Sequence, residues 1–94
     1  ALANQVLNGF LQELPVMRAT IEHAVQACDA SGIEQGAHHL NGAAANLCLS
    51  RLQVKAQSLE SAGHDKDNFA AFELFSSLVM EMDLARQGIE HHLT

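Results

Sequence analysis

The sequence predicts an all-α protein, an antiparallel up-down-up-down four-helix bundle with a short additional N-terminal helix. Apolar residues recur at spacings of three and four along several long segments, which is typical of amphipathic helices. The chain has one proline and is 48% hydrophobic but only 4% aromatic, a composition that suits a core of Leu, Ala, Val and Met. Short clusters of turn residues separate the periodic segments, as in an up-down bundle.

Two helices are expected before residue 29. Residues 1–14 are predicted to form the short first helix, whose apolar face is Leu2, Val6, Phe10 and Leu14. Pro15 is disfavoured inside a helix because it lacks a backbone N–H, so a new helix is expected to begin there. The apolar stripe of that helix consists of Leu14, Met17, Ile21, Ala24 and Cys28. The turn residues 29–32 are expected to end it.

The next helix is expected from about residue 33 to residue 48, with Ser31 as its N-cap. Its inward stripe is Ile33, Ala37, Leu40, Ala44 and Leu47. Ser50 and Gln53 resemble a capping box that would begin the following helix. The inward residues of that following helix are Leu52, Ala56 and Leu59.

Residues 62–67 read as the clearest loop of the chain, and a long last helix is expected after them. The apolar side of this helix is predicted to be Phe69, Phe72, Phe75, Val79, Met82, Ile89 and Leu93. We expect its phenylalanines to belong to the core rather than to a ligand pocket.

The length and composition of the chain favour one small domain, residues 1–94. A net charge of −6 argues against nucleic acid as a partner. No apolar run reaches the roughly 18 residues that a membrane span needs, so no direct membrane contact is expected. Cys28 and Cys48 fall at apolar or near-apolar helix positions and are expected to be reduced and structural, in a cytoplasmic protein. The chain has no glycine-rich nucleotide loop, so ATP binding is not expected.

The helix at residues 33–48 places His38 on its outer side, about 140° from the centre of the apolar stripe. Its neighbours there are Glu34, Asn41, Gly42 and Ala45. A glycine inside a helix costs about 1 kcal/mol relative to alanine, and Gly42 leaves room beside His38 for another protein. His39 lies about 120° from the stripe on the opposite flank, so exposure alone does not distinguish the two histidines.

The carboxylates are unevenly distributed. Residues 35–59 contain none, whereas Arg51 and Lys55 both fall inside this window. These two cations are i,i+4 neighbours on the helix expected to pack beside the His38 helix. The window therefore predicts a face near His38 that attracts a group with about two negative charges.

Residues 37–42, Ala-His-His-Leu-Asn-Gly, resemble the A-H-x-L-K-G signature of histidine phosphotransfer (HPt) domains, and the likeness extends to residues 43–48, Leu52 and residues 59–60. Asn41, Ala43 and Cys48 replace the usual lysine, serine and glycine. The register of the motif selects His38 over His39. The resemblance implies a four-helix bundle that acts in a multi-step two-component phosphorelay.

By this resemblance, His38 accepts a phosphoryl group from a receiver-domain aspartate and passes it to another receiver aspartate. The domain is then a phosphoryl carrier rather than a stand-alone enzyme, with no cofactor of its own and with Mg²⁺ on the partner receiver. Supporting roles are expected for Gln35, Asn41, Gly42 and Lys55. Partner docking is expected for Glu34, Ala45 and Arg51. We expect a monomer, and the C-terminal domain of a hybrid sensor kinase.

Two alternatives remain open from the sequence. A helical interaction module that has lost phosphotransfer is suggested by Asn41, and a dimerisation bundle like the histidine-bearing domain of a sensor kinase is the other. No metal site is expected, because adjacent histidines such as His38 and His39 point about 100° apart on a helix and cannot easily share one ion.

Overall fold

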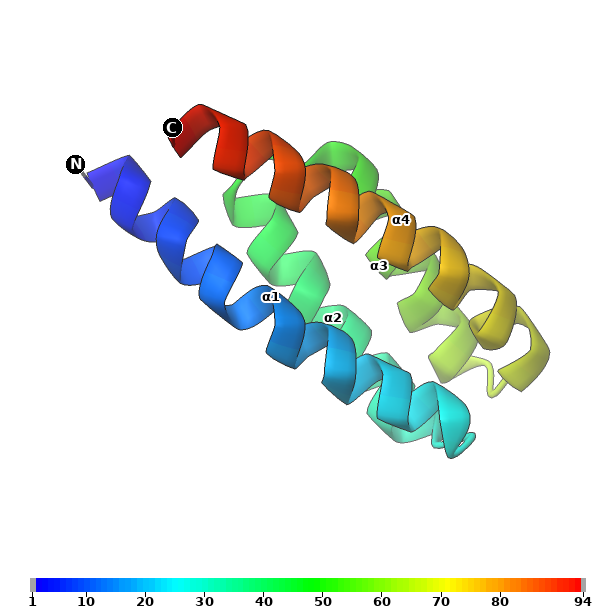
Figure 1. The fold of residues 1–94 in the computed structure, drawn as a ribbon. Helices are drawn as coiled ribbons and strands as arrows, with labels where there is room; N and C mark the ends of the chain where they lie inside the picture. The colour runs from blue at the N-terminus through cyan, green and yellow to red at the C-terminus, as the bar shows by residue number, and fades with distance from the viewer. Residues whose placement is uncertain (1, 94) are drawn as a thin grey trace.

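The computed structural model describes the backbone of residues 2–93 and the side chains of residues 4–93. These residues form α1 (Leu2–Gln26), α2 (Ala30–Asn46), α3 (Ser50–His64) and α4 (Asn68–Leu93). Each helix runs antiparallel to the next, and α1 and α3 each pack against both α2 and α4 (Figure 1). The bundle measures 41 × 19 × 18 Å. The predicted all-α four-helix bundle is confirmed.

The prediction of an additional N-terminal helix is wrong, because α1 continues through Pro15. Proline removes one helical hydrogen bond, here to the carbonyl of Leu11. Leu14 and Met17 on either side are each only 5% exposed, so their packing holds the helix together across the proline. Of the face predicted for this segment, Phe10 and Leu14 are buried and Val6 is exposed. The side chain of Leu2 lies outside the described side chains.

Three similar turns join the helices. Cys28, Cys48 and Lys66 have φ angles of 53°, 57° and 57°, and in each case the next residue donates a backbone hydrogen bond back into the helix. This pattern is the Schellman cap, in which glycine is the favoured residue. Both cysteines are therefore exposed turn residues, and their prediction as apolar helix positions is wrong. Cys48 occupies the conformation that the glycine expected from the resemblance would adopt most readily.

Aspartates cap α2 and α4, and neither of the two predicted serines is a cap. Asp29 accepts a hydrogen bond from the backbone N–H of Gly32, at 3.1 Å, and Asp67 accepts one from Ala70, at 3.0 Å. Leu49 precedes α3 without a side-chain cap. Ser31 and Ser50 instead lie inside the first turns of α2 and α3, so both predicted serine caps are wrong. An aspartate that directly follows a Schellman turn is well placed to cap the next helix.

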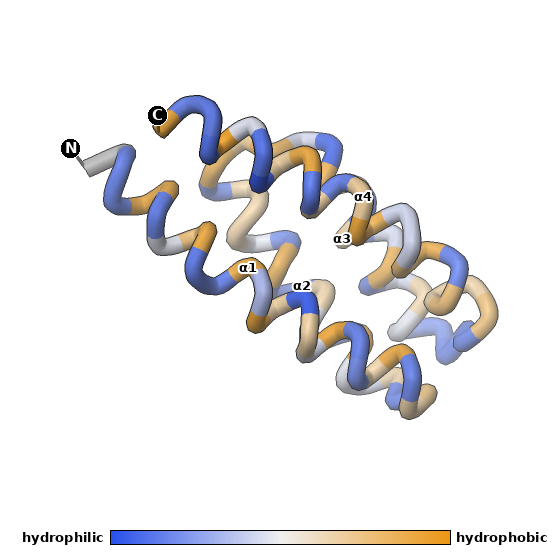
Figure 2. The backbone as a smooth tube through the Cα atoms, viewed as in Figure 1, coloured by the Kyte–Doolittle hydropathy of each residue, from blue (hydrophilic) through white to orange (hydrophobic). Residues whose placement is uncertain are grey.

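The core lies along the bundle axis, and each helix alternates between hydrophobic and hydrophilic residues (Figure 2). Its largest fully buried side chains are Ile21, Ile33, Leu40, Leu52, Leu59 and Leu78. The inward stripes predicted for α2 and α3 are confirmed, except that Leu47 is only half-buried. No helix within residues 2–93 is both long enough and apolar enough to cross a membrane.

The predicted apolar side of α4 is partly wrong. Phe69 is 74% exposed and Phe72 is 69% exposed. The apolar residues of the helix that are buried in the core are Ala71, Leu78, Met82 and Ile89, so Met82 and Ile89 of the predicted side are confirmed. Phe75, Val79 and Leu93 are half-buried.

Helices α2 and α3 approach closely where α3 ends. A Cβ atom on Gly63 would lie 2.7 Å from the backbone nitrogen of Glu34 and 3.0 Å from the carbonyl oxygen of Ala30. Both are backbone atoms of α2, which cannot move aside as a side chain can. Gly63 and its neighbours belong to α3, which runs to His64, so the predicted loop is limited to the turn after that residue.

A buried carboxylate connects α3 to α4. Glu81 is 8% exposed and is held by two contacts from Arg51, Nε to Oε1 at 2.9 Å and Nη2 to Oε2 at 3.1 Å. Such a paired geometry satisfies both carboxylate oxygens. Arg51 thus forms an ion pair with the buried carboxylate of Glu81.

We predict that Gly63→Ala lowers the free energy of unfolding by about 2 kcal/mol, because the new methyl group meets backbone atoms of α2. Gly42→Ala is the matched control, since nothing lies within 4 Å of its Cβ position. It should raise stability by about 0.5–1 kcal/mol through helix propensity alone. Urea unfolding measures both values, and a stabilised Gly63→Ala would contradict the close contact.

We also predict that Arg51→Met destabilises the bundle by about 1–3 kcal/mol, because it leaves a buried carboxylate without its partner. Replacing Glu81 by Met in the same protein should recover most of that loss. Lys55→Met, one turn further along α3, should change stability by less than about 0.5 kcal/mol. Equal effects of Arg51→Met and Lys55→Met on the thermal midpoint would refute the role given to Arg51.

Candidate functional site

His38 lies on the outer side of α2 with 75% of its side chain exposed. Behind it, Ala37, Leu40 and Ala44 are fully buried, so the helix that carries His38 is fixed by its packing against the core. The predicted outward orientation of His38 is what the structure shows. An imidazole placed in this way is accessible to a second protein while its backbone is held rigid.

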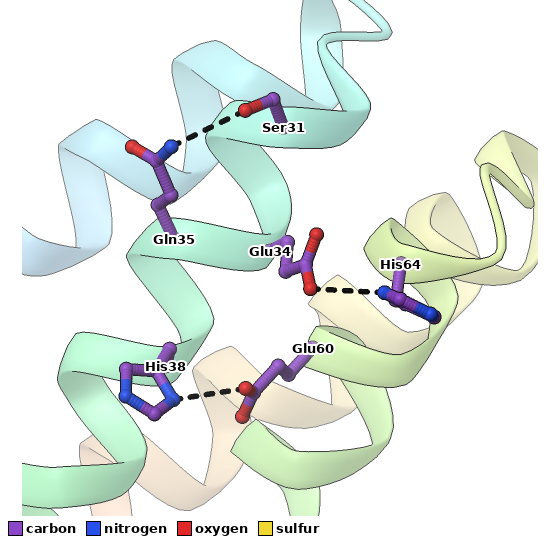
Figure 3. Close-up of polar contacts among 6 residues, drawn as sticks. All are labelled: Ser31, Glu34, Gln35, His38, Glu60 and His64. Carbon is purple, nitrogen blue, oxygen red and sulfur yellow. Dashed lines mark hydrogen bonds and ion pairs between the residues drawn. The ribbon is translucent and has the colours of Figure 1, made fainter.

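A carboxylate from the neighbouring helix orients the imidazole ring. The Nδ1–H of His38 donates a hydrogen bond to Oε2 of Glu60 on α3, at 2.9 Å (Figure 3). In the neutral ring, a proton on Nδ1 leaves an unprotonated lone pair on Nε2. This contact therefore directs the nucleophilic nitrogen of the neutral ring, Nε2, away from Glu60 on an exposed side chain.

The sequence motif did not reveal the role of Glu60. The window of residues 35–59 has no carboxylate, but the fold brings Glu60, the residue directly after it, onto His38. A cross-helix partner depends on the register between α2 and α3, which the spacing within either helix does not fix. The face beside His38 is therefore not free of carboxylates, and that expectation is wrong.

Arg51 and Lys55 lie on another side of α3. Counting about 100° per residue, they are about 180° and 140° around the helix from Glu60. Both line the groove between α3 and α4 that contains Glu81. The structure therefore does not bring the two predicted cations to His38, and the attractive face inferred from their sequence positions is not formed there.

The other predicted residues of the site differ in their surroundings. Gln35 donates from Nε2 to Ser31 Oγ at 3.3 Å, one turn back along α2 and not toward His38 (Figure 3). Glu34 accepts a hydrogen bond from Nδ1 of His64 at 3.1 Å. Ala45 is exposed, and Gly42 faces open space.

Asn41 lies one turn after His38 and lines a surface groove between α2 and α3 together with Gln57 and Glu60. Its Oδ1 atom is enclosed and has no hydrogen-bond partner among the described residues. Enclosed acceptors without a donor are uncommon and costly in folded proteins. Asn41 thus adds an amide to the wall of the groove beside Glu60.

His39 has a different environment. Its side chain is 65% exposed, and its nearest carboxylate is Glu13 on α1, 4.0 Å from Nε2. Among the side chains of residues 4–93, none gives Nδ1 of His39 the carboxylate contact that Glu60 gives Nδ1 of His38. Among residues 2–93, no group of three or more His, Cys, Asp or Glu side chains is arranged to hold a metal ion.

Comparison with known proteins agrees with the geometry. The model of the Hpt domain family matches residues 5–88, which include His38, the whole of α2 and α3, and most of α1 and α4. Searches of curated proteins and of solved structures gave no significant match. The fold, the exposed imidazole and the family match lead to one conclusion: this chain belongs to the Hpt family, the histidine phosphotransfer domains of phosphorelays.

Proposed function

We propose that His38 carries the phosphoryl group of this domain, accepting it from an aspartyl phosphate of one receiver domain and passing it to an aspartate of another. One observation supports this assignment above the others. His38 is the histidine that the register of the motif selects, and its Nδ1 is hydrogen-bonded to Glu60 at 2.9 Å, so that its Nε2 is left for chemistry.

The proposed transfer step is balanced. The lone pair on Nε2 attacks the phosphorus, the bond from phosphorus to the aspartate oxygen breaks, and aspartate leaves as a carboxylate. The Nδ1 proton stays on the ring, which becomes a phosphorylated imidazolium. Glu60 then stabilises the positive charge through a charge-assisted hydrogen bond. Transfer to the second receiver is the same step in reverse, with a new aspartate as the nucleophile.

The partner must neutralise the charge of the phosphoryl group. Phosphoryl transfer depends mainly on positioning and on electrostatic stabilisation, and the nearest charged side chain to His38 is an anion. We propose that the receiver supplies the Mg²⁺ ion and the cationic groups. The isolated domain, acting as a monomer, supplies the imidazole on a rigid helix.

The proposed docking surface is the outer face of α2 around His38, with Glu34, Asn41, Gly42 and Ala45. The absence of a side chain at Gly42 lets the partner approach the ring. Arg51 and Lys55 are not part of this surface, because they lie in the groove between α3 and α4.

We predict that His38→Gln abolishes the acceptance of labelled phosphate from a phosphorylated receiver domain. His39→Gln is the matched control, since it removes the adjacent exposed imidazole and should leave the rate of acceptance unchanged. Circular dichroism would verify that both variants remain helical. Loss of labelling in the His39 variant alone would show that His39, and not His38, is the acceptor.

A second prediction concerns Glu60. Removing the carboxylate in Glu60→Ala should lower the rate of acceptance about tenfold, because a charge-assisted hydrogen bond to the forming imidazolium is lost. Glu60→Gln should lose less, since an amide oxygen still accepts from Nδ1–H. Rapid-quench kinetics with saturating receiver separates this change in rate from weaker docking. Unchanged rates in both variants would show that Glu60 has no part in the step.

A further inference from the structure

A short segment of α2 is repeated in α3. Residues 33–38 read Ile-Glu-Gln-Gly-Ala-His, and residues 59–64 read Leu-Glu-Ser-Ala-Gly-His. Both segments have a buried aliphatic residue, a glutamate, two small residues and an exposed histidine in the same order. Ile33 and Leu59 are 1% and 0% exposed, so the two segments also have the same orientation relative to the core.

The antiparallel packing of α2 and α3 makes the two segments partners. Glu60 receives the hydrogen bond of His38, and Glu34 receives that of His64, at 2.9 and 3.1 Å (Figure 3). A half-turn rotation about an axis perpendicular to the two helices exchanges the two glutamates and the two histidines. Both contacts use Nδ1, and the exposed fractions of His38 and His64 are 75% and 74%.

We propose that His64 is a second phosphoryl acceptor of this domain. This inference rests on the proposed function, because the donor is again the aspartyl phosphate of a receiver domain. Nε2 of His64 attacks the phosphorus, the bond to the aspartate oxygen breaks, and aspartate leaves as a carboxylate. The proton on Nδ1 stays on the ring and is held by Glu34, as Glu60 holds it at His38.

The local two-fold relation also explains how a receiver reaches His64. A receiver that covers the outer face of α2 and α3 meets the same two glutamate–histidine pairs after a half-turn rotation. In one orientation its aspartate faces His38, and in the other it faces His64. The groove between the helices, which Glu34, Glu60 and His64 line, is common to both orientations.

The surroundings make His64 the slower acceptor. It is the last residue of α3, where the helix dipole places partial negative charge. Besides Glu34, the charged side chains nearest in sequence are Asp65, Lys66 and Asp67, which together add a further negative charge. We expect acceptance at His64 to be on the order of tenfold slower than at His38.

The test compares the unsubstituted protein with His38→Gln, His64→Gln and Glu34→Gln. Potassium phosphoramidate serves as a donor that needs no docking: Nε2 attacks the phosphorus, the P–N bond breaks and ammonia leaves. Tandem mass spectrometry locates the phosphoryl groups. We expect His64 in the His38→Gln variant to be phosphorylated severalfold faster than His39. With this small donor, Glu34→Gln should slow His64 more than it slows His38, because Glu34 contacts Nδ1 of His64.

A second arm uses a receiver domain that discharges phosphorylated His38. It should also discharge phosphorylated His64 in the His38→Gln variant, on the order of tenfold more slowly. Labelling of His64 that is no faster than that of His39, or a phosphorylated His64 that the receiver does not discharge, overturns the proposal. If a phosphorylated receiver fails to label His38 in the unsubstituted protein, it is the proposed function that fails. The two failures are therefore distinguishable.

Discussion

The close contact between α2 and α3 at Gly63 is the constraint on which the site depends. The missing side chain lets the backbone of α3 reach the first turns of α2, where a Cβ would lie 2.7 Å from the nitrogen of Glu34. Because the helices are rigid and antiparallel, this contact fixes which residues face each other along the groove. Glu60 faces His38, and Glu34 faces His64. A small residue in the core thus determines the orientation of an exposed ring.

A carboxylate beside the acceptor of an anionic group has a clear physical role. Glu60 contacts Nδ1, on the side of the ring away from the reacting Nε2. In this position it favours the tautomer that can react, and it stabilises the cation that forms when phosphorus binds. The two cations of α3 are used elsewhere, Arg51 on the buried Glu81 and Lys55 in the same groove. In the proposed mechanism, the partner neutralises the charge of the phosphoryl group, and this domain orients the nucleophile.

Much of the fold could be predicted from the sequence, because the apolar spacing within α2 and α3 has one interpretation. Where two interpretations competed, local pattern was insufficient. Pro15 signals a helix start, but the burial of Leu14 and Met17 keeps α1 continuous. In α4, apolar residues occupy a wide sector of the helix, and only packing shows that Met82 and Ile89 are buried while Phe69 and Phe72 are exposed.

The site also has residues that the sequence predicts and residues that it does not. The motif and its register predict His38 as the acceptor from one helix alone, since both are properties of that helix. Glu60 and His64 could not be assigned from one helix alone, because their partners are defined by the register between helices. The repeated glutamate and histidine in residues 33–38 and 59–64 were the available signal. Their meaning depends on the antiparallel packing that Gly63 permits.

The central claim concerns one atom, so the most direct test locates the phosphorus on the ring. Nuclear magnetic resonance of the ¹⁵N-labelled, phosphorylated protein resolves the coupling between phosphorus and each imidazole nitrogen. The account predicts coupling to Nε2 of His38, with Nδ1 still protonated and bonded to Glu60. Phosphorus on Nδ1 of His38, or a His38 ring that never becomes phosphorylated, would contradict it.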